Sequence, residues 1–169
     1  MHITLYMAPS IDGYIAKSNK ESEWVDEVCV DSFMQTIHEY GCIIMGNTTY
    51  SMYTPDLYPI KDVLNIVITS NHPSKPNTSN LVFAKDAKEA LEMAQSLRHK
   101  MALLIGGGTT NSSFLKDNYI DDIILDIHPI ILGKGIKIFE NIEKQVELER
   151  TSINPMENGL VQIRYKVIK

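Results

Sequence analysis

The chain has 169 residues, 44% of them hydrophobic, and a formal net charge of -5. This acidic balance argues against nucleic acid as a partner, because phosphate backbones select for clustered Lys and Arg. No apolar run approaches the roughly 20 residues that a membrane helix needs, and the first residues read as a strand rather than a signal peptide. We therefore expect one cytoplasmic domain over residues 1–169, with no membrane partner.

Metal and serine-hydrolase chemistry find little support in the sequence. Cys29 and Cys42 are the two cysteines, and their spacing is not that of a metal site. The five histidines are scattered, with no HxxxH or HExxH pair, and GxSxG is absent. We expect reduced thiols and no bound metal.

Strand and helix patterns alternate over the first two thirds of the chain. Apolar runs predict strands over residues 3–7, 42–45, 63–69, 81–83 and 101–105. Helical spacing predicts helices over about 27–39, after Asp86, and from near Thr109. Strands that alternate with helices imply a parallel sheet with helices on both faces.

The last third of the chain changes character. A strand is expected over 120–127, followed by a loop with two glycines over 128–135. Residues 146–153 and 160–167 alternate between apolar and polar around a turn sequence, which predicts an antiparallel hairpin. The expected fold class is therefore α/β, with a mainly parallel central sheet and an antiparallel C-terminal hairpin.

The stretch MALLIGGGTTNSSFL, residues 101–115, is the most informative of the chain. An apolar strand runs into Gly106, Gly107 and Gly108, and the hydroxyl residues Thr109 and Thr110 begin a helix. Such a junction forms a phosphate site, because exposed amides and the helix dipole favour negative charge. Glycine also lets a phosphate approach the backbone. The alternative is a plain tight turn.

Two further strand ends share this design. Residues 45–49 (MGNTT) and 69–71 (TSN) also place small polar side chains after a buried strand. The carboxyl ends of parallel strands meet at one edge of a sheet, where ligands bind in open α/β folds. Three such ends suit a long phosphorylated ligand such as a dinucleotide. Helix caps and turns are the alternative explanation.

Four motifs, in this order, carry a resemblance to a known superfamily. They are SIDGYIA at 10–16, MGNTTY at 45–50, IGGG at 105–108 and PIILGKG at 129–135, with Phe139 behind the last. The chain resembles the dihydrofolate reductase-like superfamily, and within it the C-terminal reductase domain of bifunctional riboflavin-biosynthesis proteins and its stand-alone relatives. The resemblance implies a three-layer dihydrofolate reductase-like fold and an NADPH-dependent reductase, usually a homodimer. Its substrate would be a small pterin- or pyrimidine-like heterocycle or another carbonyl or imine compound.

The resemblance also implies which residues bind the cofactor. They are Ala8, Ile15, Gly46, Asn47, Thr48, Thr49, Thr69, Ser70, Gly106, Gly107, Gly108, Thr109 and Thr110. The first two would lie along the nicotinamide, and the others along the phosphates and the adenosine. Asn47 stands where the family typically has an arginine, the natural partner of a 2′-phosphate. NADH is therefore possible beside NADPH, unless His72, Lys75 or Lys85 replaces that arginine.

A proton donor must accompany hydride transfer, and two carboxylates are candidates. Asp31 lies on the helix expected after Trp24, where dihydrofolate reductases place their carboxylate, and Asp12 lies near the expected nicotinamide. An acid favoured by the helix dipole and a simple Asp-Gly turn are the respective alternatives. Trp24, Phe33 and Ile105 would contact a flat substrate, although a lone tryptophan also serves as a core or loop anchor.

A second function stays open at this point, that of a non-catalytic nucleotide-binding protein that retains the fold. Oxidation of a reduced nicotinamide in the presence of a substrate would separate the two. A phosphate-ester hydrolase would need metal ligands or a nucleophile that the sequence does not offer.

Overall fold

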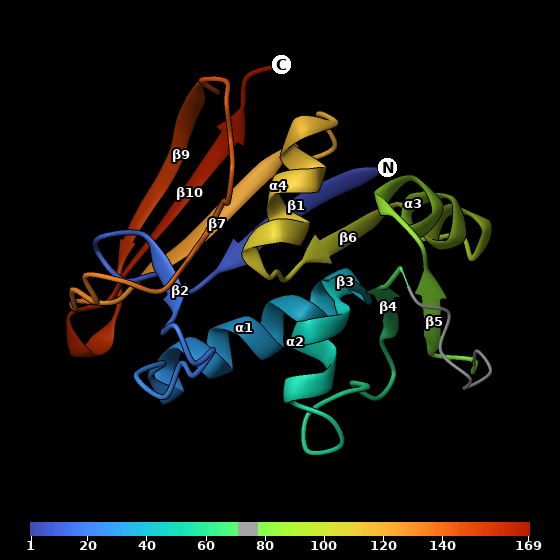
Figure 1. The fold of residues 1–169 in the computed structure, drawn as a ribbon, viewed down its shortest axis with the longest axis horizontal. Coiled ribbons are helices and arrows are strands. Elements are labelled where there is room, and N and C mark those ends of the chain that lie inside the picture. Colours follow the sequence, from blue (N-terminus) through green and yellow to red (C-terminus); the bar gives the residue numbers. More distant parts are fainter. Residues whose placement is uncertain (71–77) are drawn as a thin grey trace.

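One mixed sheet forms the middle layer of the computed structural model, which describes residues 1–70 and 78–169 (Figure 1). Its strands are β1 (His2–Met7), β3 (Cys42–Gly46), β4 (Leu64–Ile68), β5 (Leu81–Ala84), β6 (Met101–Leu104), β7 (Asp122–Ile127), β9 (Leu148–Pro155) and β10 (Val161–Val167). Their order is β5-β4-β3-β6-β1-β7-β10-β9. The strands from β5 to β7 run parallel, whereas β10 pairs antiparallel with β7 and β9. The predicted α/β class is confirmed.

Helices cover both faces of this sheet (Figure 1). They are α1 (Glu27–Tyr40), α2 (Asn47–Met52), α3 (Ala87–Ser96) and α4 (Gly108–Lys116). Successive side chains of a strand point to opposite faces. From β1, Leu5 therefore packs in the cluster that contains Phe114 of α4, whereas Tyr6 packs in the cluster that contains Ile37 of α1. In the ranges that the structure describes, no helix is long and apolar enough to cross a bilayer.

Capping residues define both ends of α1 and the start of α3, and α3 begins directly after Asp86, as predicted. The Asp26 carboxylate accepts a hydrogen bond from Val28 N at 2.9 Å, and Gly41 ends α1 with a φ of 64°. The Asp86 carboxylate caps α3 through Glu89 N at 2.8 Å. Such caps satisfy amides that have no partner within the helix, and glycine adopts the left-handed conformation at little cost. Local chemistry therefore sets where both helices begin.

Two short strands differ from the expectation. β2 (Tyr14–Ala16) and β8 (Ile136–Lys137) pair antiparallel in a separate small sheet, and the sequence predicted neither strand; β8 directly follows the loop predicted over 128–135. Strands this short carry too few side chains for their periodicity to be detected. A Cβ on Gly135 would lie 2.1 Å from the carbonyl oxygen of Ala16, so glycine permits this close approach.

Candidate functional site

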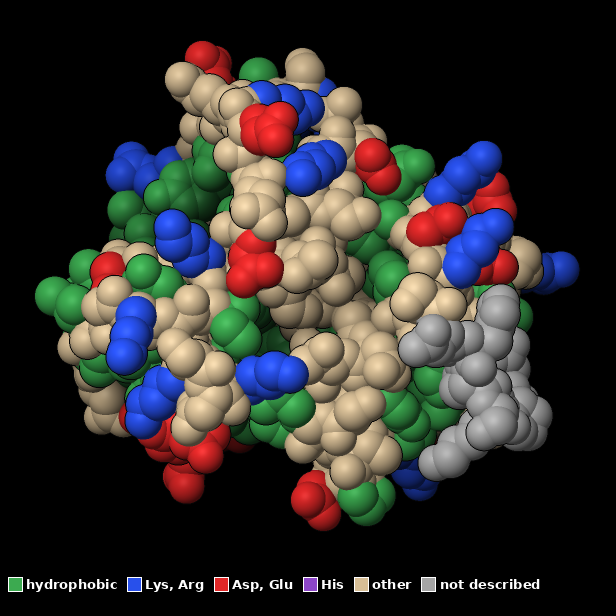
Figure 2. Space-filling view, in the orientation of Figure 1, with side chains coloured by type: hydrophobic (Ala, Val, Ile, Leu, Met, Phe, Trp, Pro, Cys, Tyr) green, Lys and Arg blue, Asp and Glu red, His purple; other side chains and the backbone are tan. Residues whose placement is uncertain are grey.

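A cavity of about 920 Å³ opens at the carboxyl ends of β1, β3, β4 and β6. In the space-filling view this face is hollowed near its centre, with hydrophobic side chains inside the hollow (Figure 2). Its walls come from α1, from the N-termini of α2 and α4, and from the segment that follows α2. All three polar strand ends contribute to its lining, as the parallel topology leads us to expect.

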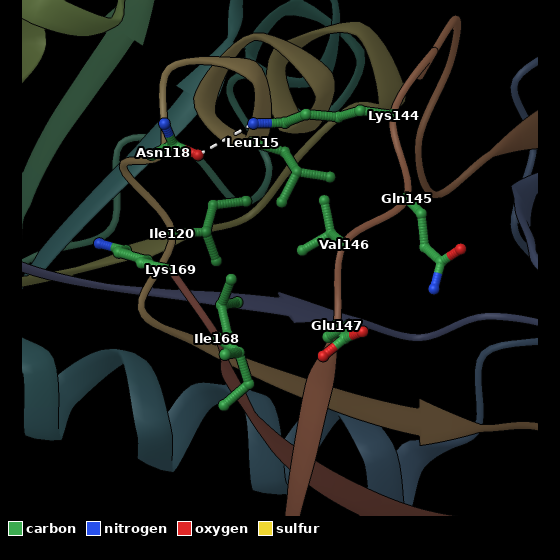
Figure 3. A pocket seen from close by; sticks show the side chains of 10 residues that line it. Leu115, Asn118, Ile120, Lys144, Gln145, Val146, Glu147, Ile168 and Lys169 are labelled. Atoms are coloured by element: carbon green, nitrogen blue, oxygen red, sulfur yellow. Dashed lines mark hydrogen bonds between the residues drawn. The ribbon is translucent and has the colours of Figure 1, made fainter.

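A smaller cavity of about 380 Å³ lies near the C-terminus, beside the amino end of β7 (Figure 3). Leu115, Ile120 and Val146 contribute apolar side chains to it, and Lys144 Nζ donates to Asn118 Oδ1 at 3.0 Å beside them. It contains none of the residues predicted for cofactor or substrate binding. The candidate site is therefore the larger cavity.

Nearly all residues predicted to bind a cofactor line the larger cavity. They are Ala8, Ile15, Gly46, Asn47, Thr48, Thr49, Thr69, Ser70, Gly107, Gly108, Thr109 and Thr110. Gly106 does not line it; its carbonyl oxygen accepts a hydrogen bond from Gly46 N at 2.8 Å and so joins two of the strand ends. Lys85 is exposed outside the cavity, and His72 and Lys75 lie outside the described residues. Cofactor binding by these residues stays a prediction.

Two helices begin at this cavity without a side-chain cap. Gly46 and Gly107, the cap residues of α2 and α4, supply no side-chain hydrogen bond, whereas aspartates cap α1 and α3. The first N–H groups of a helix have no partner within it and carry the positive end of its dipole. Both N-termini therefore offer donors to an anion in the cavity, which is the usual arrangement of phosphate sites.

Gly46 and Gly108 are required for packing, whereas the sequence analysis expected glycine to allow a phosphate to approach the backbone. A Cβ on Gly46 would lie 2.5 Å from Thr110 Oγ1, and a Cβ on Gly108 would lie 2.3 Å from a carbonyl oxygen of β8. Packing between segments, rather than ligand approach, therefore excludes larger residues at these two positions. At Gly107, by contrast, a Cβ would meet only Thr49 Oγ1, at 3.6 Å. Gly107 is the glycine that leaves the backbone open to the cavity.

One carboxylate lies beside the N-terminus of α4. Thr109 Oγ1 donates to Glu140 Oε2 at 2.9 Å, and Glu140 itself lines the cavity. A negative charge is stabilised at a helix N-terminus, so Glu140 competes there with any other anion. The sequence analysis missed this residue, because it belongs to no motif and reaches the site only through the fold.

The two carboxylates predicted as proton donors do not line the cavity. Asp12 accepts hydrogen bonds from Ser10 Oγ at 2.7 Å and from the N–H groups of Leu132 and Gly133 at 3.1 and 2.7 Å. These bonds, that from Ser10 above all, lower the pKa of Asp12, so it joins two loops as an ionised acceptor. Asp31 is exposed on α1, because the apolar side of this helix faces the cavity. Neither carboxylate therefore lines the cavity, and the role of either as proton donor stays a prediction.

Two of the three residues predicted to contact a substrate line the cavity. Phe33 and Ile105 line the cavity, where a flat substrate was expected, but Trp24 does not. Trp24 is half-buried in the segment before α1, and its indole Nε1 is buried with no partner among the described residues. The alternative role as a loop anchor accounts for it better than substrate contact. The Phe33 ring packs against Tyr6, with 5.2 Å between ring centroids.

A buried carboxylate lies behind the part of the cavity formed by α1 and β1. The Tyr6 hydroxyl donates a hydrogen bond to Asp126 Oδ2, and the Cys29 thiol donates to the same oxygen at 3.4 Å. Gln162 Nε2 donates to Asp126 Oδ1 at 2.9 Å. Burial first, and then the charge of Asp126, raise the pKa of the Tyr6 hydroxyl and of the Cys29 thiol. Both groups therefore stay protonated and remain donors.

The hydrogen-bond network around Asp126 was not predicted from the sequence either. Its members come from β1, α1, β7 and β10, so no local pattern unites them. The available signal was an acidic residue inside an apolar strand, since Asp126 stands between Leu125 and Ile127. A charged residue is almost never fully buried unless it has partners.

Comparisons with known proteins identify the family and agree with the fold. The sequence profile of the RibD C-terminal domain family matches residues 1–162. The chain is 28% identical over 154 residues to the uncharacterized protein YwjB of Bacillus subtilis (strain 168), over 85% of this chain and 86% of that one. A putative riboflavin biosynthesis protein from Shewanella sp. PV-4 has a TM-score of 0.82 at 24% identity, over 100% of both chains. A diaminohydroxyphosphoribosylaminopyrimidine deaminase/5-amino-6-(5-phosphoribosylamino)uracil reductase from Thermotoga maritima has a TM-score of 0.78 at 15% identity, over 99% of this chain and 56% of that one.

A mainly parallel sheet with open helix N-termini at its carboxyl edge and an antiparallel hairpin at its side defines a protein with a reductase-like α/β fold. The family profile covers most of this sequence. The chain belongs to the RibD C-terminal domain family. The resemblance drawn from the four sequence motifs is confirmed.

Proposed function

We propose that this chain is an NADPH-dependent reductase that transfers a hydride to a small heterocyclic, carbonyl or imine substrate. The observation that carries the proposal is the pair of open helix N-termini, those of α2 and α4, at one cavity on the carboxyl edge of the sheet. Membership of the RibD C-terminal domain family supports it, and the similar protein from Thermotoga maritima is named as a reductase. We also propose that the protein forms a homodimer, as the family resemblance implies.

The residues of the cavity fit a reduced dinucleotide. The open amides at Gly107 and the start of α4 would bind the pyrophosphate, and those of α2 a neighbouring phosphate. Thr69 and Ser70 would contact the adenosine, and Ala8 and Ile15 would flank the nicotinamide with apolar surface. When bound, the cofactor supplies the hydride. The chain contributes orientation of the two reactants and a site shielded from water.

The choice between the two nicotinamide cofactors depends on the start of α2. Asn47 is exposed at the first position of this helix and lines the cavity. Its amide donates hydrogen bonds but lacks the charge and the fork geometry of an arginine. We propose NADPH as the cofactor, as the family resemblance implies, and because Asn47 lacks this charge we propose that NADH is accepted as well.

A non-catalytic nucleotide-binding protein is the second candidate function. The absence of Asp12 and Asp31 from the lining of the cavity favours it, since both were the expected proton donors. A reductase can still take its proton from a water held in the site. Oxidation of NADPH in the presence of a substrate distinguishes the two functions.

A titration of the purified protein with NADPH and NADH, side by side, tests the proposal. A ligand that binds only the native state raises the melting temperature. This readout is preferable to tryptophan fluorescence, because Trp24 does not line the cavity. A larger rise with NADPH than with NADH supports the proposed cofactor, and equal rises support relaxed cofactor choice. No rise with either overturns the proposal.

A further inference from the structure

The end of the cavity between α1 and α2 is apolar up to its rim. Large apolar side chains there remain partly exposed: Val30 is 45% exposed, Met52 41%, Tyr53 37% and Leu57 38%. Isolated exposed apolar residues are ordinary, but a group around one opening is typical of a ligand-binding surface. We call the part of the cavity that is lined by these four residues, together with Tyr6, Cys29 and Phe33, the apolar end. Its lining suits a flat hydrophobic ring.

Charged groups are scarce around this end. Among the described residues that line the cavity, Lys20 and Glu140 are the ones with a charged side chain. Lys20 is exposed, so water and salt screen its charge, and Glu140 lies at the start of α4. Asp126, which lies just behind Tyr6 and Cys29, is 0% exposed. Among the described residues, the buried acidic side chain behind the apolar end is therefore that of Asp126.

This charge has no cationic partner in the part of the chain that the structure describes. No lysine, arginine or histidine there forms an ion pair with Asp126. Its hydrogen-bond donors are neutral, and Arg164 Nε donates to Gln162 Oε1 at 3.0 Å, so it reaches the carboxylate only through the amide. An unpaired carboxylate in a poorly hydrated site creates a negative potential that water screens weakly.

The directions of the hydrogen bonds reinforce this potential. Tyr6 and Cys29 each carry a single proton, and each donates it to Asp126. The oxygen of Tyr6, which also lies 3.2 Å from Ser32 Oγ, and the sulfur of Cys29 keep lone pairs for other partners. Both residues line the cavity. Its apolar end therefore presents acceptors that are backed by a negative charge.

We propose that the apolar end binds a flat, largely apolar aromatic ring that carries a positive charge, and that it disfavours phosphorylated substrates. Tyr6 and Cys29 contact the ring, and Asp126 is a positioning residue that acts through them. The inference rests on the proposed reductase function and names its substrate class. A phosphate group would bring like charge toward the buried carboxylate, which is unfavourable.

Three acridines of similar size and different charge test this inference. At neutral pH 9-aminoacridine is a cation, acridine is neutral and acridine-9-carboxylate is an anion. In equilibrium dialysis against the protein saturated with NADPH, we expect the Kd of the cation to be about tenfold below that of the anion, equivalent to about 1.4 kcal/mol. The preference should persist at about 1 M salt, where the Debye length is about 3 Å, because the charge is buried.

Variants identify the source of the preference. Asp126→Asn removes the charge and should bring the three affinities close together. Glu27→Gln removes an exposed charge from α1, outside the cavity, and should leave the preference unchanged. Tyr6→Phe keeps the carboxylate and the Cys29 contact but removes the other group through which Asp126 acts, so it should weaken the preference for the cation without abolishing it. The melting-temperature rise with NADPH shows that each variant retains the native fold.

Three results would overturn the inference: tighter binding of the anion, binding of none of the rings, or an unchanged preference in folded Asp126→Asn. If NADPH still raises the melting temperature in these experiments, the proposed reductase function stands and only the substrate class is wrong. If NADPH has no effect on the wild-type protein, the proposed function itself fails.

Discussion

The hydroxyl of Tyr6 donates a hydrogen bond to the carboxylate of Asp126, which links the side chains of β1 and β7 directly behind the cavity. The two strands already pair through their backbones, with Tyr6 beside Ile124. The side-chain bond adds a second connection on the same face of the sheet as α1. This pair of residues therefore contributes to stability, and in our proposal it also determines which ring the cavity prefers.

Tyr6→Phe should lower the free energy of unfolding by about 1–3 kcal/mol, because it leaves a buried carboxylate oxygen with one partner fewer. Urea unfolding measures this change. Tyr14→Phe is the control, since the Tyr14 hydroxyl makes only an exposed contact with the Gly133 carbonyl at 3.4 Å. A surface change of this kind should stay within about 0.5 kcal/mol. Equal losses in the two variants would contradict the structural role given to Tyr6.

Gly107→Asp should abolish nucleotide binding while the protein stays folded. The φ of Gly107 is -78° and its Cβ would make only an ordinary contact, so the backbone accepts the change. The new carboxylate would cap α4, which should stabilise the helix by roughly a few tenths of a kcal/mol relative to glycine. It would also repel the pyrophosphate and weaken NADPH binding by more than about a hundredfold.

Calorimetric titration with NADPH and a melting curve together measure these opposite effects. Gly107→Ala is the matched control, because it adds the Cβ without the charge and should bind NADPH far better than the aspartate variant. Unchanged affinity in a folded Gly107→Asp protein would show that the pyrophosphate does not lie at α4.

Asn47→Arg should raise the affinity for NADPH relative to NADH. An arginine at the first position of α2 would place a guanidinium fork at the cavity, where it can pair with a 2′-phosphate. A gain of about tenfold in the ratio of the two dissociation constants is expected, as for one added charge-assisted hydrogen bond. If both affinities change by the same factor, or neither changes, Asn47 does not face the 2′-phosphate.

Glu140→Gln should tighten NADPH binding several-fold. The Glu140 carboxylate accepts from Thr109 Oγ1 at the start of α4, where it opposes an incoming phosphate. Removing its charge relieves a repulsion of about 0.3–1 kcal/mol, the size of a typical interaction at an exposed helix end. Glu143→Gln, at an exposed site outside the cavity, should bind like the wild type. Weaker binding by Glu140→Gln would mean that Glu140 helps to hold the cofactor.

Asp121 should make stability depend on acid pH. Burial alone would raise its pKa, but Lys169 Nζ at 2.6 Å and Ile3 N at 2.8 Å outweigh burial and lower the pKa below the usual value. The stabilisation is therefore present above the pKa of an unfolded aspartate, about 3.9, and is lost as the pH falls through the lower pKa of the folded state. Asp121→Asn should melt below the wild type at neutral pH and approach it near pH 2. A constant difference over this range would exclude the linkage.

The part of the cavity formed by the polar strand ends was predictable because its information is local. Each of its strand ends carries the same small polar residues directly after an apolar run, and a parallel sheet brings such ends together. The starts of α1 and α3 were predictable for the same reason, since Asp26 and Asp86 cap them through bonds two and three residues away. Local chemistry needs no knowledge of the tertiary fold.

The other end of the cavity was not predictable in this way. Tyr6, Cys29 and Asp126 meet only after β1 and β7 have paired and α1 has packed over them. The orientation of Asp31 was not predictable for a related reason. The neighbouring Val30 lines the cavity, and a rotation of α1 about its axis by one residue position would exchange the two side chains. That rotation is set by packing against the sheet, which helical periodicity alone does not resolve.

The position of β1 in the sheet also bears on how the protein is made. β1 lies between β6 and β7 in the sheet. His2 can pair only after Met101 has been synthesised, and Thr4 can pair with β7 only after Asp122 has been synthesised. During synthesis β1 leaves the ribosome before β6 and β7 and therefore stays without these neighbours until residues 101–127 have followed. Contacts so distant in sequence form slowly, and an apolar strand left unpaired is a target for chaperones and for aggregation. A nascent chain that stalls before residue 101 would expose this strand for as long as it stalls.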